Sequence, residues 1–181
     1  MESASEPGAL ILIGHGAPAR DTPKGLVRRL KMLESERVSR GGHAAPMTEE
    51  ERELDSSVRR WPRTRENDPY REGVEALAYF LREIAHPMRV RVAFNELCAP
   101  TLEEVVDELV AEGVSRIVIV TTMMTPGGVH ADEEIPAEVE RLRRRLDGVE
   151  LRYAWPFDLR AVARLLFDQA ASQALPITAT T

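Results

Sequence analysis

Two histidines and one glutamate each follow an apolar run that is typical of a buried strand. His15 comes directly after Ala-Leu-Ile-Leu-Ile-Gly, Glu96 after Val-Arg-Val-Ala-Phe-Asn, and His130 a short loop beyond Arg-Ile-Val-Ile-Val. In an open parallel α/β sheet, ligands bind outside the carboxyl ends of the strands. Three such strands would therefore bring these side chains to one edge of the sheet. Because two imidazoles and a carboxylate suit a divalent transition metal, the sequence predicts a metal site there.

The apolar periodicity alternates between strand and helix along most of the chain. We expect strands at 9–13, 89–94, 116–120 and 149–154, and helices at 24–36, 48–60, 70–84, 101–111, 137–146 and 158–170. Strands separated by helices of this length predict βαβ units with right-handed crossovers. The expected fold class is therefore α/β, with an open four-stranded parallel sheet flanked by helices in one domain, 1–181.

The first crossover is too long for a simple βαβ unit. More than seventy residues separate Gly14 from Arg89, where a crossover needs about a dozen residues together with its helix. Residues 37–46 are polar and contain two glycines, so we expect a loop there. We call residues 37–69 the insertion. The chain leaves the first strand at the end that carries His15. We therefore predict that the insertion lies beside the site, as a lid or binding loop.

Composition narrows the class of protein. A net charge of −6 argues against a nucleic-acid partner, and no apolar run is long enough to predict a membrane span. The single cysteine, Cys98, excludes an internal disulfide, is consistent with a cytoplasmic location and is expected to be a core residue. Arginine outnumbers lysine by 22 to 2. Arginine suits carboxylate recognition, but a coding bias explains the excess equally well.

Glycines accompany both histidines, in Gly-His-Gly around His15 and in Pro-Gly-Gly-Val-His before His130. Adjacent glycines admit close approach of a ligand to the backbone. Neither a phosphate loop nor a serine nucleophile elbow is present, so a metal-dependent hydrolase is only a weak alternative. The acidic residues 132–134 have two equally supported interpretations. They attract a cation or accept protons, or they stabilise the N-terminus of the next helix through its dipole. We expect His43 and His86 to be surface residues whose replacement by alanine is silent.

Three segments resemble the small, single-domain class of sirohydrochlorin chelatases, the cobaltochelatases and ferrochelatases of cobalamin and sirohaem biosynthesis. They are 10–16, 93–100 and 101–157, and the Thr-Pro-Gly-Gly-Val-His-Ala-Asp-Glu-Glu-Ile-Pro stretch at 125–136 carries much of the resemblance. It implies a chelatase-like fold and a lyase-type enzyme that inserts Co²⁺ or Fe²⁺, with Ni²⁺ as a further candidate, into sirohydrochlorin or a related tetrapyrrole. It also implies no organic cofactor.

The same resemblance assigns metal binding and catalysis to His15, Glu96 and His130. We expect the macrocycle to contact Gly16, Arg20, Met123, Met124, Gly127, Gly128, Trp155 and Phe157, with Arg59, Arg60, Arg63 and Arg65 as further candidates for its carboxylates. The alternative function is a non-catalytic tetrapyrrole- or metal-binding carrier. Longer family members have two such domains in one chain, which predicts a homodimer for this half-sized chain. The chain departs from the family by lacking the serine that usually follows Gly-His-Gly.

Overall fold

The computed structural model describes residues 8–43 and 45–173. Its four strands form one parallel sheet, as the sequence predicts, and their order in the sheet is β2-β1-β3-β4. The strands are β1 (Ala9–Gly14), β2 (Arg89–Phe94), β3 (Arg116–Thr121) and β4 (Glu150–Tyr153). All four carboxyl ends therefore lie at the same edge, because every neighbouring pair is parallel.

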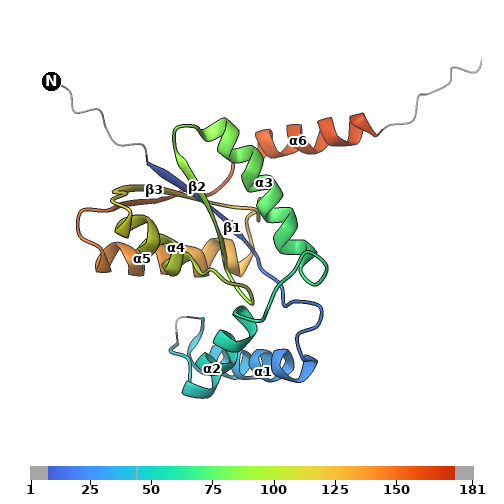
Figure 1. The fold of residues 1–181 in the computed structure, drawn as a ribbon, viewed down its shortest axis with the longest axis vertical. Coiled ribbons are helices and arrows are strands. Elements are labelled where there is room, and N and C mark those ends of the chain that lie inside the picture. Colours follow the sequence, from blue (N-terminus) through green and yellow to red (C-terminus); the bar gives the residue numbers. More distant parts are fainter. Residues whose placement is uncertain (1–7, 44, 174–181) are drawn as a thin grey trace, which may run out of the picture.

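Helices lie on both faces of the sheet (Figure 1). They are α1 (Lys24–Gly41), α2 (Glu49–Arg59), α3 (Pro69–Ala85), α4 (Leu102–Ala111), α5 (Ile135–Arg145) and α6 (Leu159–Ser172), and a π-helical turn η1 (His130–Glu134) precedes α5. Helices α4 and α5 pack on one face, where the core includes Ile11, Ile117 and Ile119. Helix α3 packs on the other face, against Leu12 and Phe94. Helices α1 and α2 form a lobe beyond the carboxyl edge (Figure 1).

The expectation of a loop over 37–46 is wrong for its first part, because α1 continues to Gly41. The reason is a contact between distant residues. The Arg37 guanidinium is buried, forms an ion pair with the buried Glu51 of α2 at 2.8 Å and donates to the carbonyl of Ala45. This pair fixes the last turns of α1 against α2, and Gly42, with φ of 75°, ends the helix.

The last helix begins as predicted but packs differently. The Asp158 side chain caps the helix by accepting from the backbone N–H of Arg160. However, Val162 is the only buried residue of α6, and Figure 1 shows the helix projecting away from the sheet. No helix in the described part of the chain is long and apolar enough to cross a membrane.

Candidate metal centre

Backbone hydrogen bonds between β1 and β2 continue beyond the ends of the strands and fix the backbone positions of two candidate ligands. The amide of Asn95 donates to the carbonyl of Gly14, and the amide of Glu96 donates to the carbonyl of His15, each at 2.9 Å. Glu96 therefore lies directly beside His15, as an extension of the β1–β2 ladder. The His15 amide in turn donates to the Tyr70 hydroxyl at 2.8 Å, which ties this turn to the start of α3.

The structure brings His15, Glu96 and His130 together, as the strand ends predict. One potential ligand atom from each residue lies within 4.8 Å of the others. The two imidazole rings meet edge to face with centroids 4.7 Å apart, and His15 Nδ1 lies 3.6 Å from Glu96 Oε1. The three side chains are partly accessible, with exposed fractions of 42%, 14% and 27% for His15, Glu96 and His130. Such a site is both preformed and open to an incoming ion.

Hydrogen bonds set the same tautomer in both histidines. His15 Nδ1 lies 2.8 Å from the carbonyl of Gly16, and His130 Nδ1 lies 2.6 Å from Glu134 Oε2. Because carbonyl and carboxylate oxygens can only accept, both Nδ1 atoms carry the proton. Nε2 is therefore the nitrogen that each ring can offer to a metal.

Glu134 and Asn95 support His130. The sequence points to Glu134 only as part of the acidic run 132–134 and to no role for Asn95. Glu134 Oε2 accepts a second hydrogen bond from Asn95 Nδ2 at 2.8 Å. Burial raises the pKa of the Glu134 carboxyl, but the hydrogen bonds from His130 and Asn95 lower it more, so the net pKa lies below the usual value. The signal was present in the sequence: His130 and Glu134 are four residues apart, a spacing that places two side chains on one helix face.

His43 also belongs to this group, which corrects the expectation that it is a free surface residue. Its Nδ1 lies 2.9 Å from Glu134 Oε1, so a residue of the insertion reaches the carboxylate that holds His130. His43→Ala is therefore not a neutral control. By contrast, His86 is exposed, as expected. The position of His43 also places part of the insertion beside the candidate site.

A lysine of α1 contacts the carboxylate of the candidate ligand set. Lys31 Nζ lies 2.5 Å from Glu96 Oε2 and 2.9 Å from Glu34 Oε2. Burial lowers the pKa of the Lys31 ammonium, but the hydrogen bonds to Glu96 and Glu34 raise it more, so the net pKa lies above the usual value. Lys31 therefore remains positively charged next to the centre.

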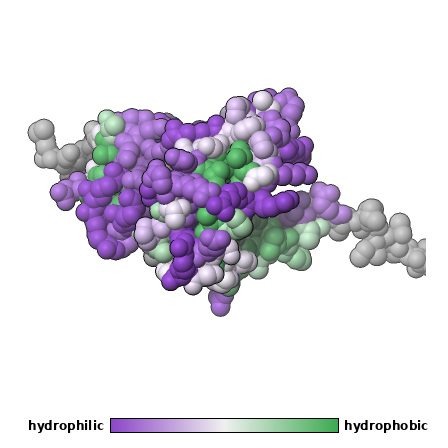
Figure 2. All heavy atoms as spheres, turned by 90° about the horizontal axis from the view of Figure 1, so that it is seen from below, coloured by the Kyte–Doolittle hydropathy of each residue, from purple (hydrophilic) through white to green (hydrophobic). Residues whose placement is uncertain are grey.

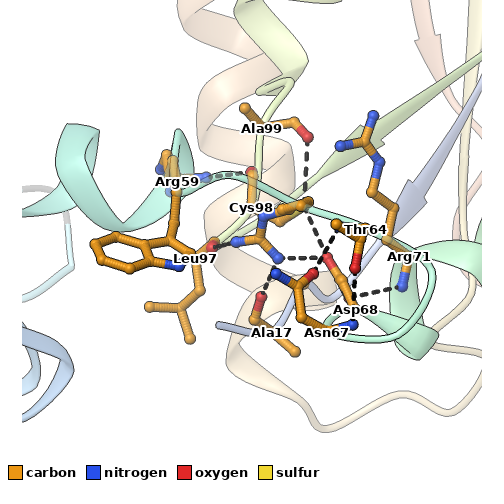
Figure 3. Close-up of polar contacts among 12 residues, drawn as sticks. Ala17, Arg59, Thr64, Asn67, Asp68, Arg71, Leu97, Cys98 and Ala99 are labelled. Atoms are coloured by element: carbon orange, nitrogen blue, oxygen red, sulfur yellow. Dashed lines mark hydrogen bonds and ion pairs between the residues drawn. The ribbon is translucent and has the colours of Figure 1, made fainter. Parts of the chain in front are cut away.

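Arg59, at the end of α2, and Arg63, in the loop to α3, hold this part of the chain against the loops after β1 and β2 (Figure 3). Arg63 forms an ion pair with Asp68 and donates to the carbonyls of Leu97 and Ala17, with only 4% of its side chain exposed. Arg59 donates to the carbonyls of Asn95 and Cys98. The expectation that Arg63 offers its guanidinium to a ligand at the rim is therefore wrong.

Cys98 is a core residue, as predicted. It is buried, and burial raises the pKa of its thiol to about 11. A thiol with so high a pKa remains protonated at neutral pH and is a poor metal ligand.

The residues predicted to contact a macrocycle lie in the loops after β1, β3 and β4. Trp155 stacks on Tyr153 with ring centroids 6.0 Å apart, and its indole N–H donates to Asp132 Oδ1 at 2.8 Å. The other carboxylate oxygen of Asp132 accepts from the amide of Gly127, so Asp132 joins the two loops. Of the remaining residues, Gly16 is buried, Met123, Met124 and Phe157 are half-buried, and Arg20, Gly127 and Gly128 are exposed.

A cavity of about 740 Å³ lies between the lobe formed by α1 and α2 and the rest of the domain. Glu96 and Glu134 line it, and of the residues predicted to contact the macrocycle only Arg59 does. Among its charged lining residues the acidic ones are in excess: Glu34, Glu51, Asp55, Glu96, Glu103, Glu133, Glu134 and Glu138 stand against Lys31, Arg37, Arg59 and Arg141. The candidate centre therefore has an acidic cavity on the side of the insertion.

The sequence profile of the CbiX family matches residues 64–174, which is more than half of the chain. The chain belongs to the CbiX family. The matched region contains Glu96 and His130, while His15 lies before it. A CbiX protein of cobalamin (vitamin B12) biosynthesis from Marinobacter aquaeolei shares the fold, with a TM-score of 0.52 and 20% identity over 93% of this chain and 100% of that one.

Two curated relatives of this CbiX chain are named as chelatases. A sirohydrochlorin cobaltochelatase from Methanopyrus kandleri is 39% identical over 69 residues, which cover 38% of this chain and 48% of the relative. A sirohydrochlorin ferrochelatase from Priestia megaterium is 30% identical over 90 residues, which cover 48% of this chain and 34% of the relative. The chain thus spans less than half the length of the curated relatives it matches.

Proposed function

We propose that this protein is a sirohydrochlorin chelatase, which inserts Co²⁺ or Fe²⁺ into sirohydrochlorin or a closely related tetrapyrrole. The observation that carries the proposal is the convergence of His15, Glu96 and His130, with one potential ligand atom from each within 4.8 Å, in a chain of the CbiX family. The names of the two curated relatives support the choice of substrate. Cobalt and iron fit equally, because ligand type alone does not decide between them.

The site has the groups that metal insertion requires. Two pyrrole N–H protons must leave the macrocycle as the ion enters, so the protein needs a metal ligand set and a proton acceptor. The Nε2 atoms of His15 and His130 are free acceptors, because both Nδ1 atoms already donate. A histidine whose Nε2 is not holding the ion can accept a pyrrole proton as a general base. Glu96 supplies negative charge for the ion.

We place the macrocycle against the loops after β3 and β4, not in the acidic cavity. Sirohydrochlorin carries several carboxylates, and the excess of acidic over basic residues around the cavity disfavours an anion there. The half-buried Met123, Trp155 and Phe157 offer the apolar contacts that a flat ring needs. The exposed Arg20 remains a candidate for the ring carboxylates.

Turnover distinguishes a chelatase from a carrier. We expect the absorbance spectrum of sirohydrochlorin mixed with Co²⁺ to convert to that of the metallated ring faster with protein than without it. The protein should act at substoichiometric amounts. Binding of both substrates without any acceleration would instead establish the carrier, which uses the same ligands.

Glu134→Ala should weaken Co²⁺ binding by about 10- to 100-fold, because the carboxylate that orients a metal-binding histidine typically contributes this much. The residue holds His130 Nδ1 at 2.6 Å and so fixes the ring. Isothermal titration calorimetry with Co²⁺ measures the effect. Glu133→Ala is the matched control, since it removes the same charge from an exposed neighbour on the same turn. Equal effects of the two substitutions would show that charge, not orientation, is what Glu134 provides.

We further propose that two copies of the chain form a homodimer through apolar surfaces of α3 and α6. Large hydrophobic side chains on both helices are accessible, including Phe80, Ile84, Leu166 and Phe167 at 59%, 80%, 61% and 67%. Figure 2 shows hydrophobic surface (green) in the lower right part of the molecule. On the α3 side of the sheet, Leu10, Val118 and Val120 are only half-buried. A second copy of the chain would cover this surface, as the resemblance to the sirohydrochlorin chelatases, with their longer two-domain members, implies.

Leu166→Glu combined with Phe167→Glu should convert the dimer into a monomer, because two charges would be buried in an apolar interface. Light scattering coupled to size-exclusion chromatography measures the mass. Gln169→Glu adds a charge to the same helix and should leave the dimer intact. A monomeric wild-type protein at micromolar concentration would contradict the proposal.

A further inference from the structure

Lys31 is one of two lysines in a chain with 22 arginines, and its ammonium contacts a candidate metal ligand. Its Nζ lies between two carboxylates, 2.5 Å from Glu96 Oε2 and 2.9 Å from Glu34 Oε2. Lys31 and Glu34 are three residues apart on α1, so the helix itself supplies the second carboxylate. The cation thus lies where it can reach either carboxylate.

We propose that Lys31 is a resident counter-cation of the metal centre, which competes with the incoming divalent ion for Glu96 and moves to Glu34 when the ion arrives. This inference rests on the proposed function, because it concerns the ion that the chelatase would deliver. It makes Lys31 a positioning residue that acts through Glu96 and does not touch the ion.

Electrostatics explain why a cation is needed there. The Glu96 side chain is only 14% exposed, and a half-buried carboxylate without a partner is costly. The ammonium satisfies it while no metal is bound. A divalent ion on Glu96 would repel the ammonium at this short separation. Because Glu34 offers a second acceptor, the lysine can leave Glu96 without losing an ionic partner.

The choice of lysine over arginine fits this exchange. An arginine would hold Glu96 with a rigid, bidentate fork, whereas lysine has a single compact charge on a flexible four-carbon chain. A chelatase must release its metal to the macrocycle and not retain it. A cation that returns to Glu96 as the ion leaves would lower the affinity of the site for metal and help that release.

Co²⁺ titration of three variants tests the inference. Lys31→Met should bind Co²⁺ about tenfold more tightly than the wild type, because the competing charge is gone. Glu34→Gln should bind Co²⁺ several-fold more weakly, because the ammonium loses its alternative acceptor. Lys24→Met removes the other lysine, at the first residue of α1, and should leave the affinity unchanged. Opposite signs for Lys31→Met and Glu34→Gln are not expected from general damage to α1.

Steady-state kinetics provide a second measurement. In Lys31→Met, both the KM for Co²⁺ and kcat should fall, because the ion is held more tightly and released more slowly. Lys31→Arg keeps the charge and should restore a Co²⁺ affinity no tighter than that of the wild type. Weaker or unchanged Co²⁺ binding by Lys31→Met would overturn the role of Lys31 while leaving the metal centre in place. A wild-type protein that binds no Co²⁺ would refute both the centre and this inference.

Discussion

His130→Ala should lower metal insertion by at least about 100-fold and leave the fold intact. The substitution removes a candidate ligand and one of two acceptors for pyrrole protons, and loss of a positioned acid–base group alone typically costs 10²- to 10⁴-fold. The side chain is 27% exposed, and its polar contacts are to Asn95 and Glu134. Its removal should therefore cost little stability. The initial rate of sirohydrochlorin metallation and a urea unfolding curve measure the two effects.

His86→Ala is the matched control for this experiment. His86 follows α3, is exposed and lies outside the candidate centre, so its variant should insert metal at the wild-type rate. His43→Ala does not serve as a control, because His43 reaches Glu134. A His130→Ala protein with wild-type activity would remove His130 from the mechanism and leave the convergence of the three side chains without a catalytic meaning.

Gly16→Ala should both destabilise the protein and disrupt the centre. Gly16 has φ of 95°, and a Cβ at this position would lie 1.8 Å from the carbonyl oxygen of Glu96. The β1 turn and the Glu96 turn would have to separate. We expect the free energy of unfolding to fall by at least about 2 kcal/mol, since the backbone conformation alone costs a non-glycine residue about 1–2 kcal/mol. Urea unfolding measures the loss, and Co²⁺ titration should show weaker binding.

Gly73→Ala separates this effect from the general consequence of replacing a glycine. Gly73 lies inside α3, and a Cβ there meets no atom within 4 Å. Alanine also favours a helix interior by about 0.5–1 kcal/mol over glycine, so this variant should be as stable as the wild type or more so. Wild-type stability and Co²⁺ affinity in Gly16→Ala would show that the two turns are not in close contact.

The sequence alone predicts the fold and the candidate ligands, because both depend on local patterns. Apolar runs of strand length separated by amphipathic helices imply a parallel sheet, and parallel strands deliver the residues that follow them to one edge. His15, Glu96 and His130 could therefore be placed together without coordinates. The predicted start of the helix at 101–111 is local in the same way, because Thr101 and Glu104 form a complete capping box at the N-terminus of α4.

The groups that tune the centre depend on tertiary structure, because their partners are distant in the chain. Lys31 contacts Glu96 across 65 positions of sequence, and His43 contacts Glu134, which is also remote from it in the chain. Arg63 looked like a surface charge, but the fold buries it with Asp68. Charged residues show no periodicity that distinguishes a solvated side chain from a buried, paired one. Residue type and spacing therefore determined which atoms could hold a metal, while long-range packing decided which charges surround them.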